Sequence, residues 1–103
     1  MTTPQALKLH ASDNVAVCTC AVHPGDAVEI MHPDGSRTTT TAVSEIAYCN
    51  KIALCDIAEN EAVTKYGEMI GRATALIPTG SLANDANIAS QPRAYADEYL
   101  LKE

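Results

Sequence analysis

The first polar residues that could do chemistry gather in a short segment between two expected strands. His10 ends one alternating apolar and polar segment, and Asp13 and Asn14 lie in the turn-forming cluster that follows it. Imidazole binds metals and transfers protons near neutral pH, so His10 is a candidate for either role. Asp and Asn at such a turn can also hydrogen-bond nearby backbone amides. This segment is therefore a first candidate site, and a histidine merely satisfied by its own turn is the alternative.

Two lysines form a second group of candidates. Lys51 and Lys65 each lie in a short apolar segment, and a lysine is a flexible point charge that can hold a substrate carboxylate. A solvated lysine on a strand edge also prevents pairing with other sheets, an alternative that fits Lys65 better than Lys51. Tyr66 and Gly67 follow directly and are expected to bend the strand, letting the backbone pass closely.

The cysteines are the third group, at Cys18, Cys20, Cys49 and Cys55. A Cys-x-Cys pair on a strand points both sulfurs to one face, so Cys18 and Cys20 with Cys49 or His10 could bind a soft metal. The Cys-x2-Cys spacing of structural zinc sites is absent, and free cysteine is among the most buried residue types. We therefore expect reduced thiols packed in an aliphatic core.

Composition narrows the class of protein. At 103 residues the chain is expected to form one domain, and it contains no Trp and no Phe, so its core should be small and aliphatic. Its formal charge is −6, without a cluster of basic residues to neutralise phosphates, which argues against nucleic acid as a partner. Its apolar stretches fall well short of the roughly 20 residues that span a bilayer, and no secretory signal is recognisable. These features predict a cytoplasmic protein without a membrane partner.

The segment 51–80 organises the expected fold. Short apolar runs alternate there with polar turns, which is typical of short, bent strands. One pattern, an apolar residue three positions before and three after a Gly or Asn, predicts a sharp corner because these residues tolerate positive φ. It occurs at Val22-x-x-Gly25-x-x-Val28, Ile57-x-x-Asn60-x-x-Val63 and Ile77-x-x-Gly80-x-x-Ala83.

These patterns predict a mainly β fold. Residues 1–5 are expected to be a flexible start, 6–88 the domain, and 89–103 a tail or docking helix, with a short amphipathic helix at 94–101. Strands are expected at 6–10, 15–20, 27–31, 36–43, 51–54, 63–66 and 70–77, with a short helical turn at 44–47.

Three blocks of this sequence resemble a known family. They are His10-x-x-Asp13-Asn14-Val15-Ala16, Lys51-Ile52-Ala53-Leu54-x-Asp56-Ile57 and Lys65-Tyr66-Gly67-x-x-Ile70-Gly71-x-Ala73. In order and spacing they resemble the SAF-type N-terminal domain of the altronate dehydratase family, which includes galactarate dehydratases and the small subunit of sulfolactate sulfo-lyase. The resemblance runs from about residue 7 to about residue 87.

The resemblance implies a β-clip fold of bent strands and a role beside a larger catalytic subunit or domain. That larger part eliminates a β-leaving group from a 2-hydroxy acid with a divalent metal, usually taken as iron. The reaction needs a base for the proton next to the carboxylate, and an acid or metal for the leaving group.

The resemblance also implies roles for individual residues. His10 and Lys51 would be catalytic, with His10 also a metal ligand. Substrate binding would fall to Asp13, Asn14, Lys65, Tyr66, Gly67 and Asn87.

The chain departs from the family pattern at three histidine positions. It has Cys49-Asn50 where many relatives have Gly-His, and Ala83-Asn84-Asp85-Ala86-Asn87 where many have Val-His-x-His-Asn. Galactarate-type members also lack the second string. Asparagine is a weak ligand for a soft divalent ion and fits hydrogen bonding better, so a metal site complete within this chain is not expected.

Three functions follow from these considerations. The first is the small subunit or N-terminal domain of a sugar-acid dehydratase, inactive alone and completing the active site of a larger partner. The others are the small subunit of a sulfolactate sulfo-lyase and a non-catalytic binding or assembly module. Exposed strand edges and the tail with Tyr95 and Tyr99 would also allow a homodimer.

Overall fold

The regular elements in the described part of the chain are strands. The computed structural model describes residues 3–90, and within this range it contains nine strands and no helix. The prediction of a mainly β fold is therefore confirmed, and the helix predicted at 94–101 lies outside the described residues. The strands are β1 (Gln5–Leu7), β2 (Val15–Cys18), β3 (Ala27–Met31), β4 (Arg37–Thr41), β5 (Lys51–Ala53), β6 (Ala62–Lys65), β7 (Glu68–Ala73), β8 (Leu82–Ala83) and β9 (Ile88–Ser90).

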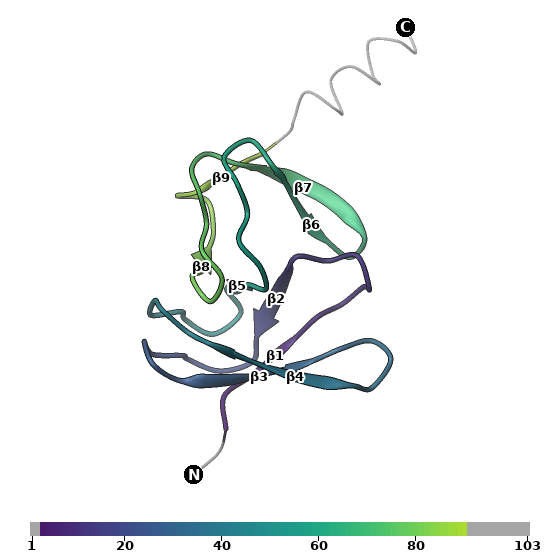
Figure 1. Ribbon diagram of the computed structural model, residues 1–103, viewed down its shortest axis with the longest axis vertical. Coiled ribbons are helices and arrows are strands. Elements are labelled where there is room, and N and C mark those ends of the chain that lie inside the picture. The colour runs from purple at the N-terminus through teal and green to yellow at the C-terminus, as the bar shows by residue number, and fades with distance from the viewer. Residues whose placement is uncertain (1–2, 91–103) are drawn as a thin grey trace, which may run out of the picture.

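The strands form two sheets that lie one above the other in Figure 1. The larger sheet has the order β4-β3-β1-β2-β5-β8, and the smaller has the order β6-β7-β9. Neighbouring strands are antiparallel except β1 and β3, which pair in parallel with Ala6 opposite Ile30. The strands expected at 27–31 and 36–43 correspond to β3 and β4, which pair as a hairpin with Ala27 opposite Thr41 and Met31 opposite Arg37.

A repeated unit builds the corners between these strands. It begins with a small buried residue, reaches a buried Val or Ile four positions later, passes through positive φ three positions after that, and ends three positions later on another buried apolar residue. Within residues 3–90 we find it four times, as Cys18-Val22-Gly25-Val28, Ala42-Ile46-Cys49-Ile52, Ala53-Ile57-Asn60-Val63 and Ala73-Ile77-Gly80-Ala83.

The first two units are joined by reciprocal hydrogen bonds. The Gly25 N–H donates to the Ala42 carbonyl at 2.8 Å, and the Cys49 N–H donates to the Cys18 carbonyl at 2.9 Å. Between these bonds the Val and Ile of the two units form an isolated antiparallel bridge. Each corner thus satisfies the backbone groups of the other, which relates the two units by an approximate twofold axis.

The last two units repeat the arrangement. The Asn60 N–H donates to the Ala73 carbonyl at 2.8 Å, the Gly80 N–H donates to the Ala53 carbonyl at 2.9 Å, and the two Ile residues form the second isolated bridge.

The three corners predicted from the sequence are confirmed, and a fourth was missed. Gly25, Asn60 and Gly80 have φ values of 91°, 72° and 86°. The fourth corner turns at Cys49, with φ of 72°. Cysteine, unlike Gly and Asn, is not a sequence signal for positive φ. The helical turn predicted at 44–47 is wrong, because Ile46 lies in this corner and bridges Val22.

Each pair of units encloses its own small core. The residues 22, 28, 30, 42, 46 and 52 belong to one cluster, and 57, 63, 73, 77 and 83 to the other. The β2–β5 ladder separates them, because side chains of successive strand residues point to opposite faces. Ala16 and Ile52, which pair, face the first core, whereas Val15 and Ala53, which also pair, face the second.

No helix in the described part of the chain is long and apolar enough to cross a membrane.

The four corners differ in their tolerance of a side chain, which gives a first prediction. At Gly80 an added Cβ would overlap the Thr41 carbonyl oxygen, whereas at Gly25 it would meet nothing within 4 Å. We expect Gly25→Ala to cost only the positive-φ strain, about 1–2 kcal/mol. Gly80→Ala should cost about 1–3 kcal/mol more, because the backbone must also move. Equal losses in urea unfolding of the two variants would contradict this packing.

Candidate functional site

The candidate site lies where the loop after β1 meets the β6–β7 hairpin. The hairpin turns through Tyr66 and Gly67, whose φ values of 60° and 75° are those of a two-residue type I′ turn. A tyrosine at such a position is uncommon, and its side chain is 67% exposed. The turn therefore presents an aromatic ring at the surface beside the loop that carries His10.

The Asp13 carboxylate joins the loop to the hairpin. Its Oδ2 accepts the N–H groups of His10 and Tyr66, each at 3.0 Å, and its Oδ1 accepts the N–H of Gly67 at 2.8 Å. The residue is only 5% exposed. A carboxylate with three backbone donors is already engaged within the chain, so its main effect is to fix the geometry of both turns.

Asn14 extends this connection to the strand itself. Its Nδ2–H donates to the Ala62 carbonyl at 2.9 Å, and its Oδ1 accepts the Thr64 N–H at 2.8 Å. Its own backbone N–H donates to the Thr64 carbonyl at 3.3 Å. The side chain thus occupies the place that a neighbouring strand would take at the edge of β6.

The imidazole of His10 packs directly on the hairpin glycine. A Cβ at Gly67 would lie 3.0 Å from Cγ and Cδ2 of the ring and 3.1 Å from Nδ1, so a larger residue there would displace the ring by a few tenths of an ångström. Nδ1 lies 2.9 Å from the Ser12 hydroxyl and accepts the Ser12 backbone N–H at 3.2 Å. Nε2 makes no hydrogen bond within residues 3–90, and the residue is exposed. The ring is therefore held on one side and available on the other.

The structure places Lys65, but not Lys51, beside the candidate site. The Lys65 ammonium lies 5.7 Å from the centre of the Tyr66 ring, within cation–π range. Lys51 pairs with Val17 and so lies toward the far end of β2, whereas the His10 loop enters β2 at Val15.

Asn87 serves a different turn. Its Oδ1 accepts the Asn84 N–H at 2.8 Å, and its Nδ2–H donates to the Leu82 carbonyl at 2.8 Å. These bonds close the loop between β8 and β9. The predicted roles of the site residues in catalysis and substrate binding stay predictions.

A divalent metal does not fit a site made from the described residues alone. Among residues 3–90 no three His, Cys, Asp or Glu side chains converge on one point. Near His10 the only carboxylate of the loop, Asp13, already accepts three backbone N–H groups.

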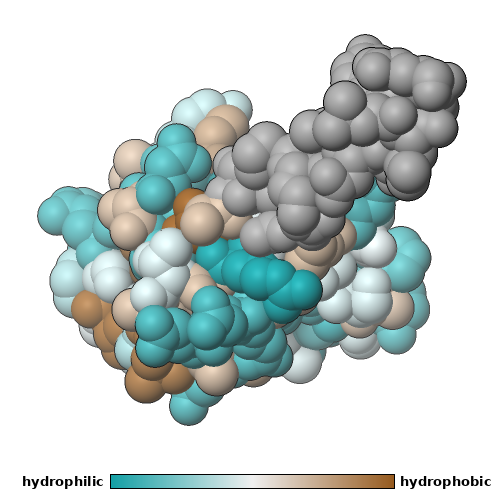
Figure 2. Space-filling view, turned by 90° about the horizontal axis from the view of Figure 1, so that it is seen from above, coloured by the Kyte–Doolittle hydropathy of each residue, from teal (hydrophilic) through white to brown (hydrophobic). Residues whose placement is uncertain are grey.

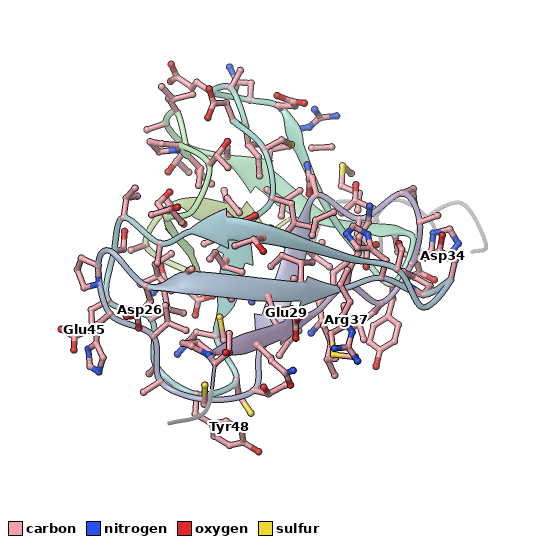
Figure 3. The ribbon with its side chains drawn as sticks, turned by 60° about the horizontal axis from the view of Figure 1, so that its bottom comes forward. Asp26, Glu29, Asp34, Arg37, Glu45 and Tyr48 are labelled. Atoms are coloured by element: carbon pink, nitrogen blue, oxygen red, sulfur yellow. The ribbon has the colours of Figure 1, made fainter. Side chains whose placement is uncertain are left out.

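A shallow hollow lies beside the same loop and was not foreseen from the sequence. It measures about 270 Å³ and is lined by Lys8, Ala11, His32, Pro33 and Asp34. Hydrogen bonds from Ser36 hold the pKa of the Asp34 carboxyl below its ordinary value. Figure 3 shows Asp34 at the β3–β4 turn, opposite the end where Asp26 and Glu45 lie. Lys8 and the His32-Pro33-Asp34-Gly35 turn lie far apart in the sequence, so their proximity leaves no local sequence signal.

The face seen in Figure 2 is mostly hydrophilic, with apolar residues gathered toward one side. Exposed large apolar side chains include Leu7, Tyr48, Met69 and Leu76.

The four cysteines are free, and they differ in environment. Cys18 is fully buried in the first core, and burial, with a smaller contribution from Cys20, raises the pKa of its thiol to about 11. The expectation of a packed thiol is confirmed for Cys18, whereas Cys49 and Cys55 are exposed.

The described residues form a small, mainly β domain in which the His10 imidazole is fixed on one side and faces outward on the other. Residues 4–91 match the family model of the altronate/galactarate dehydratase SAF domain, and the chain belongs to this family. The family indicated by the resemblance is therefore confirmed, together with its fold.

Two curated relatives support the assignment. The chain is 40% identical over 76 residues to altronate dehydratase of Escherichia coli (strain K12), covering 74% of this chain and 14% of that protein. It is 34% identical over 88 residues to galactarate dehydratase (L-threo-forming) of the same organism, covering 84% of this chain and 16% of that protein. The chain thus spans about a sixth or less of the length of these relatives.

The hydrogen bonds that the Asp13 carboxylate accepts give a second prediction. Asp13→Asn replaces one accepting oxygen by an amide donor that must face a backbone N–H, and each donor left unpaired costs about 1–3 kcal/mol. Asp26 is a matched control, because among the described residues its carboxylate accepts only the His23 N–H, in an otherwise similar turn. Urea unfolding should therefore show a clearly larger loss for Asp13→Asn than for Asp26→Asn. Similar losses would mean that the bonds to the hairpin contribute nothing.

Cys18 gives a third prediction, on pH. Its pKa is raised from 9.0 to about 11 in the folded chain, so the fold favours the neutral thiol. The resulting stabilisation is complete below pH 9 and is lost as the pH rises through about 11. In the native protein near pH 8, a thiol reagent should modify exposed Cys49 first and Cys18 last. Mass spectrometry of the peptides measures the order of modification. Early modification of Cys18 would contradict the prediction.

Proposed function

We propose that this chain is the small subunit or N-terminal domain of a sugar-acid dehydratase of the altronate and galactarate type. In this role it completes the active site of a larger catalytic part and is inactive alone. The family match over residues 4–91 supports the proposal, as do two dehydratase relatives that are several times longer than the chain.

The observation that carries the active-site role is the half-satisfied imidazole of His10. Ser12 engages Nδ1, Gly67 supports the ring, and Nε2 faces outward without a partner in the described chain. Dehydration of a hydroxy acid needs groups that handle a proton next to a carboxylate and assist a departing hydroxide. One imidazole cannot do all of this, so the remaining groups would come from the larger part.

Lys65 is the better placed of the two lysines to hold a substrate carboxylate near His10. The Asp13 bonds to Tyr66 and Gly67 connect its hairpin to the His10 loop, whereas Lys51 has no such connection. Lys51 would then contact a different portion of the substrate or of the larger part.

A divalent metal, iron according to the family resemblance, would belong to the assembled enzyme. Its ligands would come chiefly from the larger part, because the described residues do not assemble a set of their own.

An assembly module without a catalytic role is the second candidate. The internal engagement of Asp13, Asn14 and Asn87 favours it, since these side chains are used to shape turns. The sulfolactate sulfo-lyase small subunit shares the architecture of the first proposal and differs in the leaving group.

A reconstitution experiment tests the proposal. The chain is purified with the larger protein that it retains from its native extract, and the complex is assayed on sugar acids and sulfolactate. We expect elimination activity that requires both components, and a loss of about 10²-fold or more in His10→Ala.

His23→Ala is the control, because His23 occupies a similar exposed turn and should leave the rate unchanged. A complex that binds but turns over equally well without His10 would favour the assembly module. Activity on sulfolactate alone would assign the sulfo-lyase.

A further inference from the structure

We propose that His10 binds the hydroxy acid as a neutral hydrogen-bond donor, through Nε2–H, to a carboxylate or hydroxyl oxygen of the ligand. Ser12 is the positioning residue that fixes this form of the ring. The identity of the ligand rests on the proposed function, whereas the state of the imidazole rests on the geometry of this chain alone.

The Ser12 backbone sets the tautomer. A backbone N–H can only donate, and that of Ser12 points at Nδ1 of His10 over 3.2 Å. Nδ1 must therefore present its lone pair, and the Ser12 hydroxyl at 2.9 Å can add a second donor to the same nitrogen. A neutral imidazole carries one N–H, so the proton lies on Nε2.

The ring cannot easily turn to exchange its nitrogens. One of its faces packs on Gly67, whose position is fixed by the N–H bond to Asp13 at 2.8 Å. The same carboxylate holds the His10 N–H at 3.0 Å, so the backbone on both sides of the contact is anchored to one group. Rotating the ring would replace the Nδ1 acceptor by a carbon and leave the Ser12 N–H without it.

This state separates three roles that imidazole could take. A metal ligand or a base must offer a lone pair at the outward nitrogen, and a metal-bound histidine usually donates its other N–H to an acceptor. Here the inner nitrogen faces a backbone donor instead, so either role would cost the Ser12 bond. A donor role costs nothing, and the oxygens of a hydroxy acid are acceptors for it.

His23 supplies an internal contrast. Its Nδ1 lies 3.0 Å from Oε2 of Glu45, and an ionised carboxylate can only accept. The proton of His23 therefore lies on Nδ1, opposite to the state of His10. Both histidines precede an aspartate by three residues in similar turns, with hydrogen bonds between the same backbone and side-chain groups.

The first test reads the tautomers directly and needs no partner. The full chain, labelled with ¹⁵N in its histidines, is studied by long-range ¹H–¹⁵N correlation about two pH units above the ordinary histidine pKa of about 6.5. We expect His10 with Nδ1 unprotonated and Nε2 protonated, and His23 with the reverse pattern. A His10 with its proton on Nδ1, or a rapid average of both forms, would overturn the proposal.

The second test uses two amide variants in the complex. His10→Gln places an amide N–H near the position of Nε2, whereas His10→Asn reaches only the position of Nδ1, and neither amide can act as a base or bind a metal well. A donor role predicts that the His10→Gln complex is more active than the His10→Asn and His10→Ala complexes by roughly 10-fold or more.

Equal loss in all three variants would overturn the donor role in favour of base or metal chemistry. A complex whose activity never depended on this chain would overturn the proposed function, and with it the assignment of the ligand. The NMR result would still decide the tautomer in that case, so the two failures can be told apart.

Discussion

The constraint on which the rest of the structure depends is the burial of the β2–β5 ladder on both faces. Paired Ala16 and Ile52 face one core, and paired Val15 and Ala53 face the other. Strands β2 and β5 lie inside the six-stranded sheet, and the apolar layers on both sides of this pair stabilise it. Each layer is a pair of corner units whose backbone groups hydrogen-bond to one another. The two small cores therefore pack on opposite sides of the β2–β5 pair.

The same arrangement explains the rigidity of the candidate site. The loop that carries His10 leads directly into β2. The hairpin that this loop contacts contributes Val63 and Ala73 to the second core. The Asp13 and Asn14 side chains connect the loop to the hairpin through four hydrogen bonds, so the imidazole lies on a fixed junction rather than on a free loop. Residues expected to touch substrate therefore also hold the surface that presents His10, and their loss would act on both stability and function.

Much of the fold could be predicted from the sequence because it depends on local chemistry. Gly25, Asn60 and Gly80 mark their corners through their tolerance of positive φ, and alternating apolar residues mark the strands beside them. The fourth corner could not be predicted, because Cys49 adopts positive φ under the constraint of its reciprocal bonds with the first unit. Ile46 was assigned to a helical turn for the same reason, since its bridge partner lies far away in the chain.

For the site, the sequence by itself determined the family of the chain and indicated the candidate residues, because the motifs that contain His10, Asp13, Asn14 and Tyr66-Gly67 are local strings. Only the tertiary structure decided what each one touches. It brought the Asp13 carboxylate against the distant hairpin turn and separated Lys51 from His10 along β2. The physical reason is that hydrogen-bond partners and packing neighbours are set by strand register and by corners closed between remote segments, and neither leaves a signal within a short stretch of sequence.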